Sequence, residues 1–323
     1  MGTRQYLAGK VIFALLTLVF VLIFNFLLFR VLPGNPAQVL ARNKLLPKEA
    51  VEELERDFGL TKPLPEQFAL YVVDTATGNF GVSYTFRVPV SDVIGDRVWP
   101  TVLLLGVATV GSTILGVLIG IFGAWRRGSA FDVSSLGFAL VTYSMPEFWL
   151  GILLLIAFAA SLGWFPTGGM VTAGAGYTGF ANVADVANHM VLPAITLILA
   201  YIGEFALVMR SSLLDVMGED YLTTARAKGL REALVLRRHA VPNALLPTVS
   251  LVALSFGFVV SGAITVETVF SWPGLGLLSY EALRAPDYPL LQGLFLLFSV
   301  TVIVANLIAD IVYAYLDPRV RRT

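Results

Sequence analysis

The sequence predicts an all-α integral membrane protein with six transmembrane helices. Only 14% of its 323 residues are charged, whereas a water-soluble globular chain carries about a quarter. The mean hydropathy is +0.79. A helix that crosses a bilayer needs about 20 mostly apolar residues. Six segments satisfy this length, at residues 10–32, 100–124, 134–161, 190–214, 248–270 and 290–315.

The first apolar segment resembles a signal peptide only superficially. Its run from Val11 to Phe29 is longer than the apolar region of a typical signal peptide, and no small-x-small cleavage pattern follows it. We therefore expect this segment to remain as the first span.

The distribution of Lys and Arg predicts the orientation. Arg126 and Arg127 follow the second span, and a basic stretch follows the fourth, whereas residues 162–189 contain no Lys or Arg. Short cytoplasmic loops carry the excess of basic residues. We therefore expect a multi-pass membrane protein with both termini in the cytoplasm.

These boundaries predict three parts of the chain. Residues 33–99 are too polar to span a membrane, and long loops cross largely regardless of charge, so we expect an extracytoplasmic insert. Within it, "PKEAVEELERDFGL" predicts a short surface helix that begins near Pro47 and ends at Gly59. We expect residues 1–32 to form the N-terminus and the first helix, and residues 33–99 to form the insert. Residues 100–323 are expected to form the transmembrane core, which includes a cytoplasmic coupling loop at residues 215–247.

The coupling loop contains an unusual basic stretch, "TTARAKGLREALVLRRHAVPNALLP". Helical spacing predicts one helix outside the bilayer, and Pro242 and Pro247 are expected to separate it from the fifth span. A helix lying on anionic lipid would need bulky apolar residues, whereas small residues favour close docking into a protein groove. The expected apolar face consists of Leu222, Ala225, Gly229, Ala233, Leu236 and Ala240.

Ionisable residues within spans are candidates for function because their insertion is costly. Glu147 follows Pro146, where a kink is expected, and Glu204 lies deep in the fourth span. The alternatives are an interfacial position for Glu147 and local capping by Glu267. The candidate translocation pathway residues are Tyr143, Met145, Glu147, Glu204 and Glu267.

Other polar and small residues within the spans predict structural contacts. Asp310 is expected to pair with a loop arginine, and Asn25 and Asn306 to form hydrogen bonds between helices. Gly116 and Gly120 recur at four-residue spacing, which favours close packing of helices within the chain over a dimer contact.

The motifs of several enzyme classes are missing from the sequence. It has no GxSxG, HExxH or Walker A sequence and no cysteine. Gly274 and Gly276 lack the strand and helix of a dinucleotide site and predict a turn. We expect a non-catalytic chain that binds no cofactor or metal of its own.

The basic stretch resembles the cytoplasmic motif of membrane subunits in bacterial ATP-binding-cassette importers. That motif is Glu-Ala-Ala, three residues, Gly, nine residues and Ile-x-Leu-Pro. Ala225 and Gly229 match it, Thr223 and Thr224 stand at its Glu-Ala positions, and "HAVP" stands at its end. The segments "RVLPGNPA", "GNFGVSY", "YSMPEFWLG" and "VETVFSWPGLGLLSYEALRAPDYPLLQG" are similar to the dipeptide and oligopeptide branch, and the long insert to its B-type subunit.

The resemblance implies a type I importer core. It implies a second, C-type permease, two ATPase subunits or one fused ATPase that bind ATP and Mg, an extracytoplasmic binding protein and a peptide substrate. It also implies a location in the bacterial plasma (inner) membrane, with lipid as a partner and no nucleic acid. The residues implied to contact the ATPase are Tyr221, Thr223, Thr224, Ala225, Arg226, Ala227, Lys228, Gly229, Leu230, Arg237 and His239.

Three alternatives differ in class or in substrate. The same importer class takes up nickel complexes, glutathione or sugars. A stand-alone secondary transporter would carry its own coupling site and usually an internal repeat, and no convincing repeat relates the two halves of this chain. An intramembrane enzyme would need the motifs that are missing.

Overall fold

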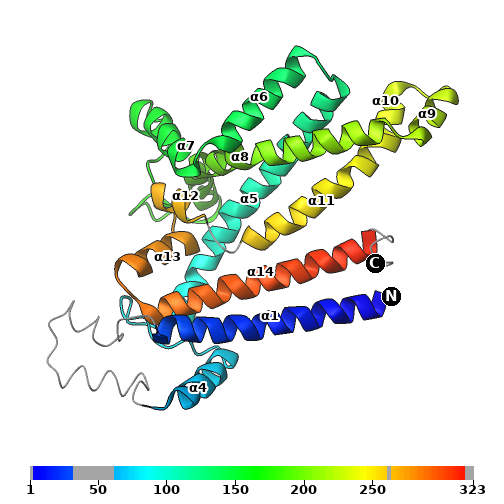
Figure 1. The fold of residues 1–323 in the computed structure, drawn as a ribbon. Helices are drawn as coiled ribbons and strands as arrows, with labels where there is room; N and C mark the ends of the chain where they lie inside the picture. Colours follow the sequence, from blue (N-terminus) through cyan, green and yellow to red (C-terminus); the bar gives the residue numbers. More distant parts are fainter. Residues whose placement is uncertain (1–2, 32–61, 260–262, 317–323) are drawn as a thin grey trace.

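The structure is a computed structural model that describes residues 3–31, 62–259 and 263–316 (Figure 1). The predicted surface helix at residues 47–59 lies outside these ranges. The described elements are helices apart from one isolated bridge between Val82 and Pro89. They are α1 (Thr3–Val31), α4 (Leu64–Ala76), α5 (Val90–Trp125), α6 (Ala130–Ser144), α7 (Glu147–Leu154), the π-helix η1 (Leu155–Ser161), α8 (Gly179–Met217), α9 (Asp220–Ala227), α10 (Glu232–Val235), the π-helix η2 (Leu236–Ala240), α11 (Val241–Phe258), α12 (Ile264–Val269), α13 (Leu275–Arg284) and α14 (Tyr288–Leu316).

Four described helices are long and apolar enough to cross a membrane, and the bent pair α6 and α7–η1 makes a fifth if it counts as one span. The predicted fifth span, 248–270, is not one continuous helix. α11 ends at Phe258, α12 is a separate short helix, and residues 260–262 lie outside the described part. α8 begins at Gly179, well before the predicted start at residue 190.

Close contact between α5 and α8 forms the centre of the fold. A Cβ added at Gly116 would lie 2.8 Å from the carbonyl oxygen of Ile202, and one added at Gly120 would lie 2.7 Å from that of Ala206. The two backbones therefore approach too closely for any larger residue. This confirms that the two glycines pack helices within one chain.

The third predicted span is broken at Pro146. α6 ends at Ser144, α7 begins at Glu147, and their axes differ by 103°. Proline disfavours helical conformation in the preceding residue and has no backbone N–H. Met145 accordingly adopts an extended conformation. The predicted kink is confirmed, and it is sharper than a bend within one helix.

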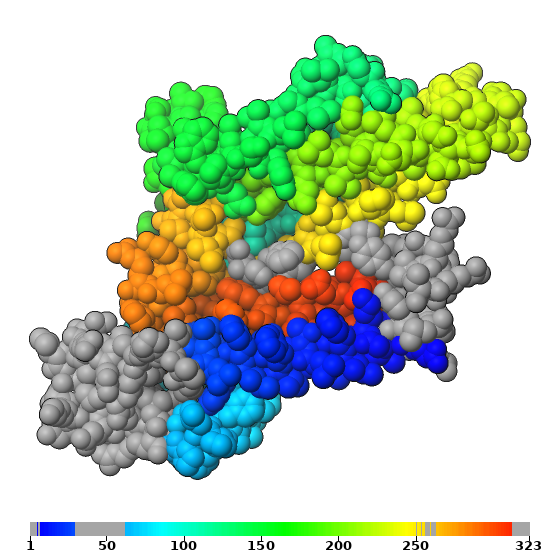
Figure 2. All heavy atoms as spheres, in the orientation of Figure 1, coloured from blue at the N-terminus to red at the C-terminus, as the bar shows by residue number. Residues whose placement is uncertain are grey.

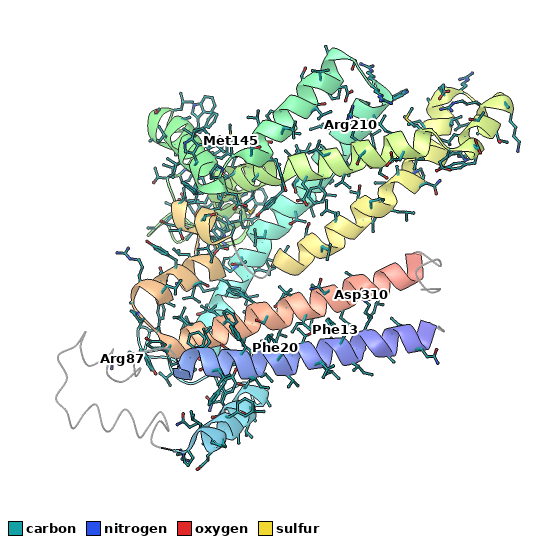
Figure 3. All side chains as sticks on the ribbon, in the orientation of Figure 1. Phe13, Phe20, Arg87, Met145, Arg210 and Asp310 are labelled. Atoms are coloured by element: carbon teal, nitrogen blue, oxygen red, sulfur yellow. The ribbon has the colours of Figure 1, made fainter. Side chains whose placement is uncertain are left out.

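α1 and α14 lie side by side along most of their length (Figure 2). Lys10 Nζ and Asp310 Oδ1 are 2.8 Å apart, so the partner of Asp310 is a residue of α1 and not the predicted loop arginine. Asn25 Nδ2 donates to the Gln292 carbonyl at 3.2 Å, which confirms an interhelical hydrogen bond for Asn25. Asn306 is exposed on α14. α1 otherwise presents apolar side chains outward, including Phe13 and Phe20 (Figure 3).

The described part of the insert is anchored to the loop before α14. Asp287 is fully buried, and its carboxylate accepts hydrogen bonds from Ser83 Oγ at 2.5 Å and from the Thr85 amide at 3.0 Å. Arg87, in the same hairpin, lies at the opposite end of the molecule from Arg210 and Asp310 (Figure 3). The insert ends where α5 begins at Val90, earlier than the predicted boundary at residue 99.

Candidate functional site

The basic stretch forms two helices instead of the single helix predicted. α9 ends at Ala227, α10 begins at Glu232, and Gly229 between them has φ = +79°. This left-handed conformation strains residues that carry a Cβ, and glycine commonly ends helices in it. Gly229 therefore terminates α9 and lets the chain reverse, and it does not belong to a continuous apolar face.

The inner face of this helical hairpin is packed against the chain itself. Leu222 is fully buried, and Ala225 and Leu236 are 8% exposed. They form one cluster with Met209 and Leu213 of α8. In this structure Leu222, Ala225 and Leu236 are therefore covered by the chain itself, while docking of the rest of the predicted face into a partner's groove stays a prediction. Hydrophobic burial within the chain covers most of that face, while Gly229 and Ala233 stay exposed.

The outer face of the hairpin is polar and open. Arg226 Nε donates to Glu232 Oε1 at 2.7 Å and joins the two helices, and Tyr221 OH lies 3.5 Å from the His239 carbonyl oxygen. Arg226, Leu230 and His239 are half-buried. The remaining predicted coupling residues apart from buried Ala225 are exposed, namely Tyr221, Thr223, Thr224, Ala227, Lys228, Gly229 and Arg237.

Neither Pro242 nor Pro247 interrupts the helix, contrary to the prediction. α10, η2 and α11 follow one another without a break from Glu232 to Phe258. The π-helical turn η2 lies immediately before Pro242, and such wider turns occur where the regular hydrogen-bond ladder is disturbed. Asn243 Nδ2 donates to the His239 carbonyl at 2.7 Å. A displacement of the α9–α10 hairpin would consequently act directly on α11.

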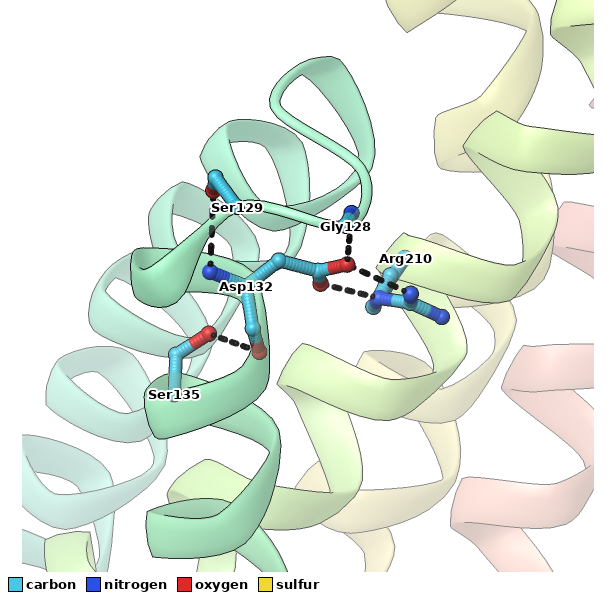
Figure 4. A network of polar contacts seen from close by, with 5 residues as sticks. All are labelled: Gly128, Ser129, Asp132, Ser135 and Arg210. Carbon is cyan, nitrogen blue, oxygen red and sulfur yellow. Dashed lines mark hydrogen bonds and ion pairs between the residues drawn. The ribbon is translucent and has the colours of Figure 1, made fainter.

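An ion pair with a buried carboxylate connects α6 to α8 (Figure 4). Asp132 accepts from Arg210 Nε at 2.6 Å and from Arg210 Nη2 at 2.9 Å, and its side chain is 4% exposed. The Gly128 amide adds a third hydrogen bond, while Ser129 Oγ caps α6 by accepting from the Asp132 amide. The sequence analysis missed this pair, although an arginine inside the predicted fourth span was a signal for it.

Two of the predicted pathway acids act electrostatically on Tyr201 of α8. The Tyr201 hydroxyl interacts with the Glu147 carboxylate and lies in the electrostatic field of Glu204. Thr265 Oγ1 donates to Glu147 Oε2 at 3.3 Å. Both glutamates are half-buried, between the fully buried core and the exposed helix faces. The structure thus brings Glu147 and Glu204 into one polar cluster, which we call the Tyr201 cluster.

Tyr143 and Met145 lie at the end of α6 that leads into the break before α7, as the label of Met145 shows (Figure 3). Tyr143 is 54% exposed. A Cβ added at Gly203 of α8 would lie 3.1 Å from the Cβ of Tyr143. Gly203 therefore lets α6 approach α8 just before Glu204.

Glu267 is separate from that cluster. It is fully buried, and its carboxylate accepts from Thr101 Oγ1 at 3.0 Å, from the Gly276 amide at 2.7 Å and from the Leu277 amide at 3.0 Å. A side-chain acceptor of this kind satisfies the free amides at a helix start. Glu267 caps α13, which corresponds to the local capping alternative.

The described residues hold no group of three or more His, Cys, Asp or Glu side chains arranged to bind a metal ion.

Gly274 precedes the first turn of α13, and its lack of a side chain leaves room for the Glu267 carboxylate. The predicted turn at Gly274 and Gly276 is therefore the start of a capped helix.

Two family models match this chain. Residues 3–105 match the N-terminal model of the binding-protein-dependent transport system membrane component, and residues 116–322 match the binding-protein-dependent transport system inner membrane component. The chain belongs to this permease family. The family assignment made from the sequence is confirmed.

Individual relatives of this permease align over almost its whole length. The glutathione transport system permease protein GsiC of Pectobacterium atrosepticum is 38% identical, with 98% of this chain and 99% of the relative covered. The probable peptide ABC transporter permease protein y4tP of Sinorhizobium fredii is 35% identical, with the same coverage. The names of these relatives agree with the predicted peptide branch.

A solved structure of the MetNI methionine ABC transporter shares the fold of the permease. The TM-score is 0.55 at 15% sequence identity, over 70% of this chain and 96% of the matched chain. The predicted all-α importer core is therefore confirmed.

Proposed function

We propose that this permease is the B-type subunit of an ATP-driven importer for di- or oligopeptides and forms half of the translocation pathway. Family membership along nearly the whole chain, together with relatives named for peptide and glutathione transport, carries the proposal. Glutathione is itself a tripeptide, so a glutathione importer is the second candidate within the same class.

The proposed partners follow from that role. A C-type permease forms the other half of the pathway, and an extracytoplasmic binding protein delivers the substrate. Two ATPase subunits, or one fused ATPase, bind ATP and Mg on the cytoplasmic side. The permease itself binds no cofactor and catalyses no reaction, and both of its termini lie in the cytoplasm.

The outer face of the α9–α10 hairpin is the proposed contact with the ATPase. Tyr221, Thr224 and Lys228 are exposed there. On the opposite face, Leu222 and Leu236 pack into the cluster that includes α8. Close-packed side chains transmit displacement because the interior is poorly compressible. Movement of the ATPase would therefore reach α8 and α11 together.

The Tyr201 cluster is the proposed polar element of the pathway. Its two glutamates lie at the start of α7 and in the middle of α8, next to largely apolar segments, where carboxylates attract cations more strongly than in water. A peptide carries an ammonium group at its N-terminus. The cluster would favour passage of that group without holding it permanently.

Reconstitution with partners tests the proposal. The full complex in proteoliposomes should show ATP hydrolysis and peptide uptake that are stimulated by the binding protein. Lys228→Glu should lower the stimulated ATP turnover about ten-fold because it reverses a charge at the proposed contact, and the matched Lys228→Arg should not. Peptide movement by the permease alone, down an ion gradient and without ATPases, would overturn the importer proposal.

A further inference from the structure

A cavity of about 670 Å³ lies between the end of α5 and the end of α8. It is lined on one side by the loop that joins α5 to α6 and on the other by the last turn of α8. The lining residues are Ala124, Trp125, Arg126, Arg127, Gly128, Ser129, Leu214, Met217 and Gly218.

The polar wall of this cavity carries unneutralised positive charge. Arg126 and Arg127 are exposed and form no ion pair within the described part of the chain. The carboxylate of Asp132, which faces the same loop, already accepts two hydrogen bonds from Arg210 and one from Gly128. Asp215 of α8 is exposed and is not among the lining residues. An anion entering the cavity would therefore meet two available guanidinium groups.

The other walls have the character of a membrane interface. Trp125 is the last residue of α5, a helix of 36 residues that is apolar enough to span a bilayer, and Leu214 and Met217 supply apolar surface beside it. Tryptophan is enriched at the level of lipid headgroups. Basic pockets between helices on the cytoplasmic side suit anionic headgroups, and arginine binds phosphate through two parallel hydrogen bonds.

We infer that this cavity binds the phosphate headgroup of an anionic phospholipid of the cytoplasmic leaflet, with Arg126 and Arg127 as its ligands. The inference rests on the proposed orientation of the chain and is independent of the transported substrate. A bound headgroup would join the α5–α6 loop to the end of α8, next to the first residues of α9. The volume accommodates a headgroup together with ordered water.

The test uses the purified permease complex in nanodiscs of phosphatidylcholine doped with phosphatidylglycerol. Native mass spectrometry after gentle release then measures the retained phosphatidylglycerol. The double variant Arg126→Gln/Arg127→Gln should lower its affinity by about thirty-fold, as expected for two basic groups. Arg126→Lys/Arg127→Lys, which keeps both charges and reports on folding, should retain most of the lipid.

A second arginine pair supplies the matched control. Arg231→Gln/Arg238→Gln removes the same charge from exposed positions outside the cavity. Retention should stay within two-fold of wild type in this variant, and an equal loss in both double variants would show general surface attraction and overturn the proposal.

Two further measurements distinguish a lipid headgroup from free phosphate, and a lipid from a protein partner. Sodium phosphate should not displace the lipid more than sodium chloride at equal ionic strength, and selective displacement would show a site for free phosphate. Unchanged lipid retention in the Arg126→Gln/Arg127→Gln variant, with or without loss of the ATPase from the complex, would likewise overturn lipid binding.

Discussion

At the scale of single residues, the acidic side chains of this permease have different roles according to their surroundings. Asp132 and Glu267 are buried, and other residues of the chain donate the hydrogen bonds that their carboxylates accept. Glu147 and Glu204 are half-buried around Tyr201. Burial with satisfied partners stabilises a fold, so the first pair is structural. Partial access permits exchange of partners, which is why the second pair is the one proposed for the pathway.

Removing one member of the Asp132–Arg210 pair should destabilise the permease strongly. Arg210→Gln leaves the Asp132 carboxylate buried without its main partner, for which we expect a loss of about 3 kcal/mol in the free energy of unfolding. Thermal unfolding in detergent measures it. The double variant Asp132→Asn/Arg210→Gln should recover part of the loss, and Arg238→Gln, an exposed control, should unfold like wild type. Equal melting temperatures for Arg210→Gln and Arg238→Gln would contradict a structural role for the pair.

Glu267 and Glu204 should respond in opposite ways to substitution. Glu267→Ala leaves the Gly276 and Leu277 amides at the start of α13 without their acceptor. We expect a loss of about 2 kcal/mol in the free energy of unfolding. Glu204→Gln should leave the melting temperature unchanged and alter the rate or preference of peptide uptake in proteoliposomes. If Glu204→Gln transports every tested peptide like wild type, Glu204 has only a packing role.

At the scale of elements, close approach of two helix backbones organises the core. α5 and α8 meet through Gly116 and Gly120, while α6 approaches α8 at Gly203. In a bilayer, helices associate through van der Waals packing and hydrogen bonds, because the lipid is as apolar as the side chains. Small residues at these contacts therefore decide which helices stay together.

Substitution of Gly120 should separate α5 from α8. An added Cβ would lie 2.7 Å from the Ala206 carbonyl oxygen and 2.8 Å from Met209 Cβ. Gly120→Val should therefore lower stability by about 2 kcal/mol or more through overpacking. Gly106→Ala is the matched control on the same helix, because nothing lies within 4 Å of an added Cβ there. A melting temperature of Gly120→Val no lower than that of Gly106→Ala would refute the close α5–α8 contact.

At the scale of the whole molecule, the two ends of the helical bundle carry different kinds of structure. One end holds α4, the hairpin anchored by Asp287, and α13. The other end holds the α9–α10 hairpin, the two arginines of the α5–α6 loop and the Lys10–Asp310 pair. The predicted orientation assigns the first end to the outside and the second to the cytoplasm.

Labelling of single cysteines should verify this orientation. The natural chain has no cysteine, so each introduced thiol is read without background. In intact cells, Ala76→Cys at the end of α4 should react with a membrane-impermeant maleimide, and Lys228→Cys should react only after permeabilisation. Both positions are exposed. The reverse pattern would invert the topology and move the α9–α10 hairpin away from any cytoplasmic ATPase.

The sequence by itself determined the class, the family and the approximate positions of the four continuous spans that the structure describes. Apolar length and the placement of Lys and Arg act locally along the chain, because each span partitions into the bilayer largely on its own composition. For the same reason, Pro146 could be recognised as a break and Gly116 and Gly120 as a packing surface before any contact was known.

Only the tertiary structure decided which face of each element is used. Asp132 and Arg210 are 78 positions apart, and Thr101 and Glu267 are 166 positions apart. No local pattern encodes those pairings. Helical periodicity placed Leu222, Ala225 and Leu236 on one apolar face, but it gave no information about what covers that face. The chain covers it with its own α8, because burial against a neighbouring element removes apolar surface from water without needing a partner protein.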